Sequence, residues 1–227
     1  MIFRQLFERE SSTYTYLIAC EKTRHAALID TVKKDLDLYI QLLRELDLTL
    51  IYALDTHTHA DHITAAGALR DLTHCTTLLG AEAHSACISH ALHDGEKIMI
   101  GELTLTALHT PGHTDDSYTY HVIDDVEHYL FTGDTLLIRG TGRTDFQNGN
   151  ARDQYHSLFH TLLTMPDNTW VYPGHDYKGW TRSTIGEEKA HNPRLQVKDV
   201  ALMNNLKLPN PTLMDIAVPA NRACGKA

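Results

Sequence analysis

The sequence predicts a single α/β domain that covers residues 1–227. Short runs of β-branched, aromatic and aliphatic residues alternate with segments whose apolar residues recur at helical spacing. Neither an internal repeat nor a low-complexity linker interrupts this alternation, and a chain of this length can bury a sizeable core. In four places an apolar run ends shortly before a histidine or an aspartate. Reactive side chains are therefore expected to gather where strands end.

The first half of the chain is expected to form strands separated by helices. Asp30 and Thr31 carry side chains that can cap the first of these helices. The apolar run 48–54 is typical of a buried strand and leads directly into a histidine-rich segment. The predicted strands are 14–19, 26–29, 48–54 and 76–79, and the predicted helices are 36–46, 63–72 and 81–92.

The second half is expected to begin with two hairpins, the first of which has the two-residue turn Gly101-Glu102. The strands of these hairpins are predicted at 97–100, 103–108, 118–123 and 128–131. A helix near 153–163 and a strand at 170–172 should follow. From about residue 186 the sequence predicts a short C-terminal tail that is helical and then irregular. Four prolines should interrupt helices in this tail: Pro193, Pro209, Pro211 and Pro219.

The composition is that of an ordinary globular protein, with 42% hydrophobic and 22% charged residues. A formal net charge of -9 argues against nucleic acid or an anionic membrane as the main partner. No apolar run is long enough to span a bilayer, and no signal or transit peptide is evident. We therefore expect a cytoplasmic protein of bacterial type.

The four cysteines show neither a CxxC motif nor any other short pairing pattern. They are Cys20, Cys75, Cys87 and Cys224. Such spacing favours reduced thiols in a reducing compartment over a disulfide framework or a zinc ribbon.

The densest chemical motif is residues 56–62, THTHADH, which holds His57, His59, Asp61 and His62. Asp61 and His62 are expected to begin the next helix. So many ionisable groups crowd together at low cost only if they share a cation, and a divalent metal is the usual one. The alternative is a capping aspartate beside solvent-facing histidines. With 16 histidines in 227 residues, the chain also has more imidazoles than ordinary surface use requires.

Three later positions can complete a metal site. His113 follows Thr110-Pro111-Gly112, Asp134 follows Gly133, and His175 follows Pro173-Gly174. Each has a simpler alternative, since a single histidine is commonly a turn residue and Asp134 could cap a helix or form an Asx turn. We expect His113 and Asp134 to be ligands and His175 to lie near the metal.

The ordered motifs HTHADH, PGH, TGD and PGH resemble those of the metallo-β-lactamase superfamily. That resemblance implies a four-layer αβ/βα sandwich with the site at one edge. In hydrolases of the superfamily, the matching positions hold two metals. His57, His59 and His113 would bind one, Asp61, His62 and His175 the other, and Asp134 would bridge them. Spacing alone does not choose between one metal and two.

A narrower resemblance extends over nearly the whole chain. Residues 142–147 (GRTDFQ), 175–177 (HDY), 192–195 (NPRL) and 217–225 (AVPANRACG) are similar to the persulfide dioxygenases. The resemblance implies one Fe(2+) per chain, held by His57, His113 and Asp134. His59, Asp61, His62 and His175 would then surround and orient these ligands.

The implied reaction converts glutathione persulfide, dioxygen and water into sulfite and glutathione. The main alternative is a dinuclear thioester hydrolase of the glyoxalase II type, although the tail is short for that enzyme's added helical region. A second alternative is a metal-binding module that has lost turnover. Homo-oligomerisation is left open by the sequence.

Glutathione carries two carboxylates, so cationic side chains are expected near the mouth of the site. Arg143 is the first choice, followed by Arg139 and Tyr177. Arg139 could instead form a salt bridge that stabilises its loop, and Tyr177 could be a packing residue.

Overall fold

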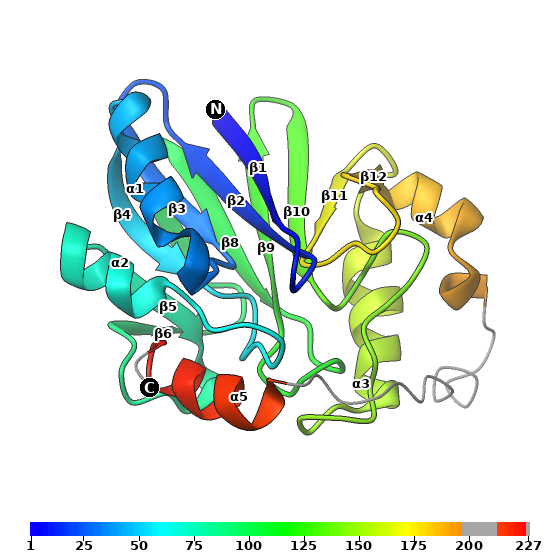
Figure 1. Ribbon diagram of the computed structural model, residues 1–227. Helices are drawn as coiled ribbons and strands as arrows, with labels where there is room; N and C mark the ends of the chain where they lie inside the picture. Colours follow the sequence, from blue (N-terminus) through cyan, green and yellow to red (C-terminus); the bar gives the residue numbers. More distant parts are fainter. Residues whose placement is uncertain (197–212, 226–227) are drawn as a thin grey trace.

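The computed structural model describes residues 1–196 and 213–225. Two six-stranded sheets face each other, with α-helices on their outer sides (Figure 1). The first sheet has the order β1-β2-β3-β4-β5-β6, antiparallel up to β3 and parallel from there to β6. Its strands are β1 (Ile2–Glu8), β2 (Thr13–Ala19), β3 (His25–Ile29), β4 (Thr49–Leu54), β5 (Thr76–Gly80) and β6 (His90–Leu92).

The second sheet has the order β12-β11-β10-β9-β8-β7 and is antiparallel except for the parallel pair β10 and β11. The two predicted hairpins, β7–β8 and β9–β10, form here. Gly101 takes a φ of +64° in the first turn, a conformation that glycine adopts without strain. The strands are β7 (Lys97–Ile100), β8 (Leu103–His109), β9 (Tyr118–Asp124), β10 (Glu127–Gly133), β11 (Trp170–Pro173) and β12 (Ser183–Thr184).

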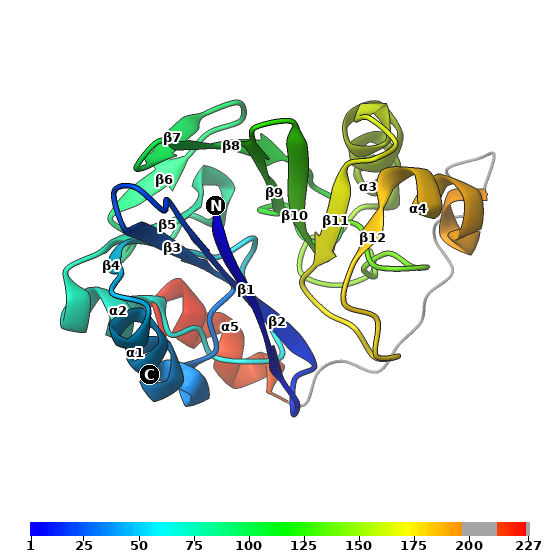
Figure 2. The same cartoon turned by 90° about the horizontal axis from the view of Figure 1, so that it is seen from above.

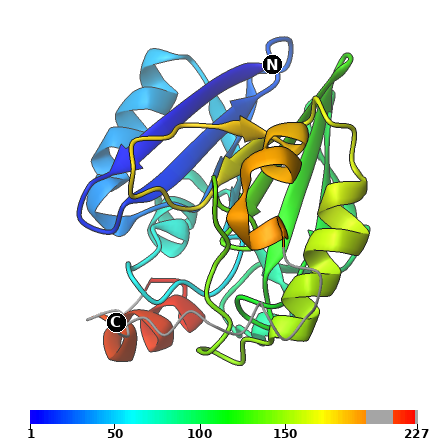
Figure 3. The same cartoon turned by 90° about the vertical axis from the view of Figure 1, so that its right-hand side faces the viewer.

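The helices form the outer layers. Figure 3 shows α1 on the side of the first sheet and α3 on the opposite side, with the strands between them. The first sheet is covered by α1 (Leu36–Glu45) and α2 (Ala66–Thr73). The second is covered by α3 (Ala151–His156), which continues to residue 164 in irregular helical turns, and by α4 (Ile185–His191). The last helix, α5 (Met214–Arg222), lies beside α2 (Figure 2).

Three apolar layers explain why these elements stack. Strand β2 is buried along its full length because its side chains alternate between two cores. Tyr16 and Ile18 face the second sheet, whereas Leu17 and Ala19 face α1 and α2. A third core lies between the second sheet and its helices, and includes Leu130, Leu158 and Val171. The predicted α/β fold of four layers is confirmed.

Three local predictions are wrong. The segment 81–92 is not a helix but a 3-10 turn, Ala81–Ala83, followed by strand β6. Residues 90–92 pair in parallel with β5, so sheet formation overrides the local helical preference. Asp61 and His62 do not begin a helix, since α2 starts at Ala66. Pro219 lies inside α5 and does not interrupt it.

The remaining tail prolines had separate outcomes. Helix α4 ends at His191, just before Pro193, as predicted. Pro209 and Pro211 lie outside the described residues, so the predicted irregular part of the tail is not described there.

The prediction of four reduced cysteines is also wrong, because Cys87 and Cys224 form a disulfide. Their Cα atoms lie 5.9 Å apart although 137 positions separate them in sequence. Local spacing carries no signal for such a pair, because only the docking of the C-terminal segment brings the thiols together. Cys20 and Cys75 are free and buried. No helix within residues 1–196 and 213–225 has the length and apolarity needed to cross a bilayer.

Candidate metal centre

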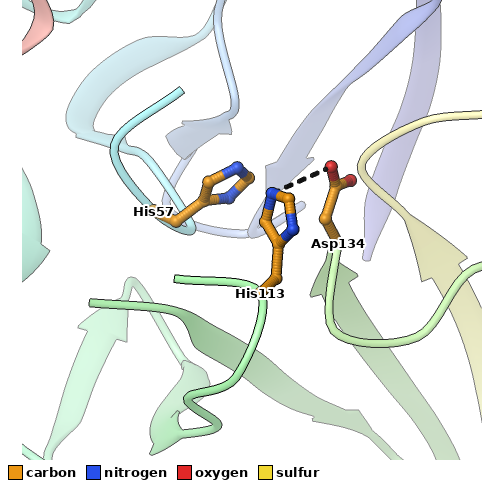
Figure 4. A group of neighbouring side chains, drawn as sticks. All are labelled: His57, His113 and Asp134. Atoms are coloured by element: carbon orange, nitrogen blue, oxygen red, sulfur yellow. Dashed lines mark ion pairs between the residues drawn. The ribbon is translucent and has the colours of Figure 1, made fainter. Parts of the chain in front are cut away.

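Three predicted ligands meet where three strands end. His57 follows β4, His113 follows β8, and Asp134 follows β10 directly. One ligand atom from each lies within 4.8 Å of the others (Figure 4). His57 and His113 are buried, and the side chain of Asp134 is only 12% exposed. The structure thus brings together three residues that the sequence predicts as ligands.

Hydrogen bonds select the nitrogen that each histidine turns to the centre. His113 Nδ1 donates to the carbonyl of Arg143 at 2.8 Å, so its Nε2 is free to face Asp134 Oδ2, 3.5 Å away. His57 Nδ1 lies 3.0 Å from Thr56 Oγ1, whose proton goes to Asp30 Oδ2 at 3.0 Å. Thr56 Oγ1 therefore accepts from His57 Nδ1, which again leaves Nε2 as a metal donor.

His175 lies between two carboxylates. Its Nδ1 donates to Asp134 Oδ1 at 2.6 Å and its Nε2 to Asp61 Oδ2 at 2.9 Å. Burial opposes a charge on this imidazole, yet the attraction of both carboxylates holds its pKa well above the ordinary value. Burial likewise opposes the charge on Asp134, but His175 and the neighbouring histidines hold the pKa of Asp134 well below its usual range.

A second group lies beside the first and comprises His59, Asp61 and His62, again with ligand atoms within 4.8 Å. His59 Nε2 donates to Asp30 Oδ1 at 3.1 Å, and His62 Nδ1 donates to Asp61 Oδ2 at 3.0 Å. Their other nitrogens, His59 Nδ1 and His62 Nε2, are buried without a partner among the described residues. Leaving such atoms unpaired is costly unless a ligand satisfies them.

These donors fit a divalent cation. Imidazole nitrogens and carboxylate oxygens are the ligands that zinc, iron and related ions take in proteins. Burial dominates the lowered pKa values of His57 and His62, which keeps both imidazoles neutral and able to coordinate. The two groups could hold one ion or two.

A cavity of about 190 Å³ opens onto the first group. Two predicted substrate contacts, Arg143 and Tyr177, line it. Arg139 does not, because its guanidinium is bound to Glu187 and to the buried Glu188. The full lining is His57, Ala60, Asp61, His113, Asp134, Leu137, Thr141, Gly142, Arg143, Phe146, Gln147, His175 and Tyr177.

The loop that carries Gly142 and Arg143, called the substrate loop below, approaches the centre closely. A Cβ on Gly142 would lie 2.3 Å from the carbonyl of Asp134 and 2.8 Å from His113 Nδ1. Only glycine permits this approach, which places the loop that carries Arg143 against the ligands.

Sequence reasoning missed two residues that hold the site. Asp30 was assigned to helix capping, but its carboxylate accepts from the Thr56 amide at 2.7 Å and from His59. Its position at the end of β3 is the same signal that identified the other site residues. Thr13 Oγ1, 3.1 Å from His175 Nε2 and 3.3 Å from Asp61 Oδ2, has no such signal in the sequence.

The two facing sheets and the His/Asp centre at the strand ends define a metalloprotein of the metallo-β-lactamase class. Residues 9–185 match the Metallo-beta-lactamase superfamily. The mitochondrial persulfide dioxygenase ETHE1 of Homo sapiens is 44% identical over 229 residues, covering 99% of this chain and 89% of that one. The crystal structure of ETHE1 from Myxococcus xanthus is 55% identical with a TM-score of 0.95, covering 99% of this chain and 100% of that one. The chain belongs to the persulfide dioxygenase family of this superfamily.

A hydrolase relative is less similar. A probable hydroxyacylglutathione hydrolase of Schizosaccharomyces pombe is 34% identical over 234 residues, covering 87% of this chain and 88% of that one. The family predicted from the sequence is therefore confirmed, and the hydrolase alternative is supported only by the more distant match.

Proposed function

We propose that this protein oxidises glutathione persulfide with dioxygen and water to sulfite and glutathione, using one Fe(2+) per chain. The observation that carries the proposal is the buried group of His57, His113 and Asp134 at the floor of a cavity. Two histidines and one carboxylate are the ligand set of non-haem iron oxygenases. Similarity to persulfide dioxygenases supports the substrate.

A ferrous ion held by these three side chains would supply the redox chemistry that reaction with dioxygen requires. The three side chains would hold the ion beside the cavity, which would offer space for the persulfide and dioxygen. The neutral His57 and the ionised Asp134 are already in the protonation states that coordination needs. His175 holds Asp134 Oδ1 by its hydrogen bond, which fixes the orientation of the carboxylate.

In this proposal His59, Asp61 and His62 form the frame behind the iron. Asp30 orients His59, and Asp61 orients both His62 and His175. These hydrogen bonds would hold the side chains next to the triad in fixed orientations.

Arg143 is the substrate contact that the structure favours. Its guanidinium is held in place by Asp145, at 2.7 Å from Nε and 3.0 Å from the second terminal nitrogen, and lies 5.5 Å from the ring centre of Phe146. The guanidinium thus lies oriented on the cavity lining, where its positive charge would attract a glutathione carboxylate although Asp145 already occupies the Nε side of its fork. We propose that Arg139 instead stabilises the loop through Glu188, and that Tyr177 borders the mouth, where it is 72% exposed.

We expect Arg143→Ala to raise KM for glutathione persulfide about 10- to 100-fold, because a hydrogen bond to a charged group contributes about 1.5–3 kcal/mol. The change in kcat should be smaller than about threefold, since the side chain does not touch the metal ligands. Steady-state oxygen uptake and metal content measure these effects. Arg152→Ala, an exposed substitution at the start of α3, is the control. An unchanged KM would remove Arg143 from the binding site.

The proposal as a whole is tested by metal analysis and oxygen uptake. Protein purified without added metal under anaerobic conditions should contain about one iron per chain, and glutathione persulfide should drive oxygen consumption with sulfite as product. Two zinc ions per chain, together with hydrolysis of S-lactoylglutathione and no oxygen uptake, would establish the glyoxalase II alternative instead. We place the reaction in the cytoplasm, where the product glutathione is a major thiol.

A further inference from the structure

The C-terminal segment reaches the metal centre through one buried side chain. Asn221, in the last turn of α5, is 6% exposed. Its Nδ2 donates to the carbonyls of His59 at 3.0 Å and of His62 at 2.8 Å, and its Oδ1 accepts from the amide of Thr64 at 2.8 Å. One amide group thus binds three backbone positions in the turn that carries His59, Asp61 and His62.

The segment that carries Asn221 is itself held at several points. The disulfide links Cys224 to Cys87, and the carbonyl of Cys224 accepts from the Gly67 amide at 3.1 Å. Lys33 Nζ donates to the carbonyl of Gly225 at 2.7 Å. A Cβ on Gly67 would lie 2.1 Å from the carbonyl of Cys224, so α2 and the end of the chain approach as closely as backbones allow. Figures 1 and 2 show α5 beside α2.

We propose that Asn221 is a positioning residue for the metal centre and that the Cys87–Cys224 disulfide tethers it there. Residues 59–64 belong to neither a helix nor a strand. This turn must nevertheless hold two imidazoles and a carboxylate close together. Asn221 replaces the hydrogen bonds that a helix or sheet would give this backbone. Side chains that orient ligands from outside the coordination sphere commonly change metal affinity about 10- to 100-fold, and Asn221, which acts one step further out through the turn of His59 and His62, should have a smaller effect.

The tether gives the arrangement a redox dependence. Reducing compartments disfavour disulfides, and with the bond open the segment keeps only its hydrogen bonds and packing. The turn 59–64 should then be less firmly held. This inference rests on the metal site and not on the identity of the substrate.

The first test uses hydrogen exchange in the metal-free protein, comparing wild type, Asn221→Ala and the control Arg222→Ala, an exposed neighbour on the same helix. The Thr64 amide should exchange at least tenfold faster in Asn221→Ala than in either other protein. Co(2+) titrated into the same proteins should bind about 3- to 10-fold more weakly to Asn221→Ala, and its visible absorption bands should shift. Thermal unfolding confirms that each variant is folded.

Two further variants separate positioning from general stability. Asn221→Asp keeps an acceptor for the Thr64 amide but places a carboxylate against two carbonyls, so Co(2+) affinity should fall while Thr64 stays partly protected. Cys87→Ser keeps Asn221 and removes the tether, and should speed Thr64 exchange by a smaller factor than Asn221→Ala.

Unchanged Co(2+) affinity and spectrum in Asn221→Ala would overturn the positioning role, and unchanged Thr64 exchange in Cys87→Ser would overturn the tether. Because Co(2+) binding is measured without persulfide or oxygen, these outcomes are independent of whether the proposed dioxygenase activity is found.

Discussion

His113→Ala is expected to lose most of its bound iron and to slow persulfide oxidation at least about 100-fold. The substitution removes one of three proposed ligands, so the loss should exceed the 10- to 100-fold typical of residues that act from outside the coordination sphere. It also leaves the carbonyl of Arg143 without the proton that His113 Nδ1 donates, which loosens the substrate loop. Iron content and oxygen uptake, measured on the same preparation, give both effects.

The control for this variant is His93→Ala, which alters an exposed histidine that is not among the residues lining the cavity. It should keep the iron content and rate of the wild type. If His113→Ala retained full iron and full activity, the proposed ligand set would be wrong, and the second group of donors would have to hold the metal.

His175→Ala is expected to weaken iron binding about 10- to 100-fold while the stoichiometry at saturation stays at one ion per chain. The imidazole donates to Asp134 and Asp61 at the same time. Without it, two partly buried carboxylates lose the cation between them, so Asp134 is no longer held in the orientation that coordination requires. Equilibrium titration of the metal-free protein with Fe(2+) under anaerobic conditions measures the affinity.

The stoichiometry decides which role His175 has. If wild type bound two ions and His175→Ala bound one, His175 would be a ligand to a second metal, as in the hydrolases of the superfamily. His191→Ala, at the exposed end of α4, is the matched control and should leave affinity and stoichiometry unchanged.

The elements that sequence alone predicted well are those whose signal is local. Hairpin β7–β8 has alternating side chains around Gly101, and α1 has an apolar stripe at helical spacing. Segment 81–92 was misassigned because its strand exists only through pairing with β5. The helix start predicted at Asp61 failed for a similar reason, since Asn221, 157 positions after Thr64, holds that turn in an irregular form.

The sequence by itself indicated which side chains form the candidate metal centre. Its motifs place His57, His113 and Asp134 after strands, and strand ends in a sandwich meet at one edge. Only the tertiary structure decided what surrounds them: Asp30 on His59, Thr13 beside His175, and the disulfide from Cys87 to Cys224. Asp30 lies 29 positions from His59 in the sequence, and Thr13 lies 162 positions from His175. Contacts over such distances depend on how the layers pack, and no local pattern of residues encodes them.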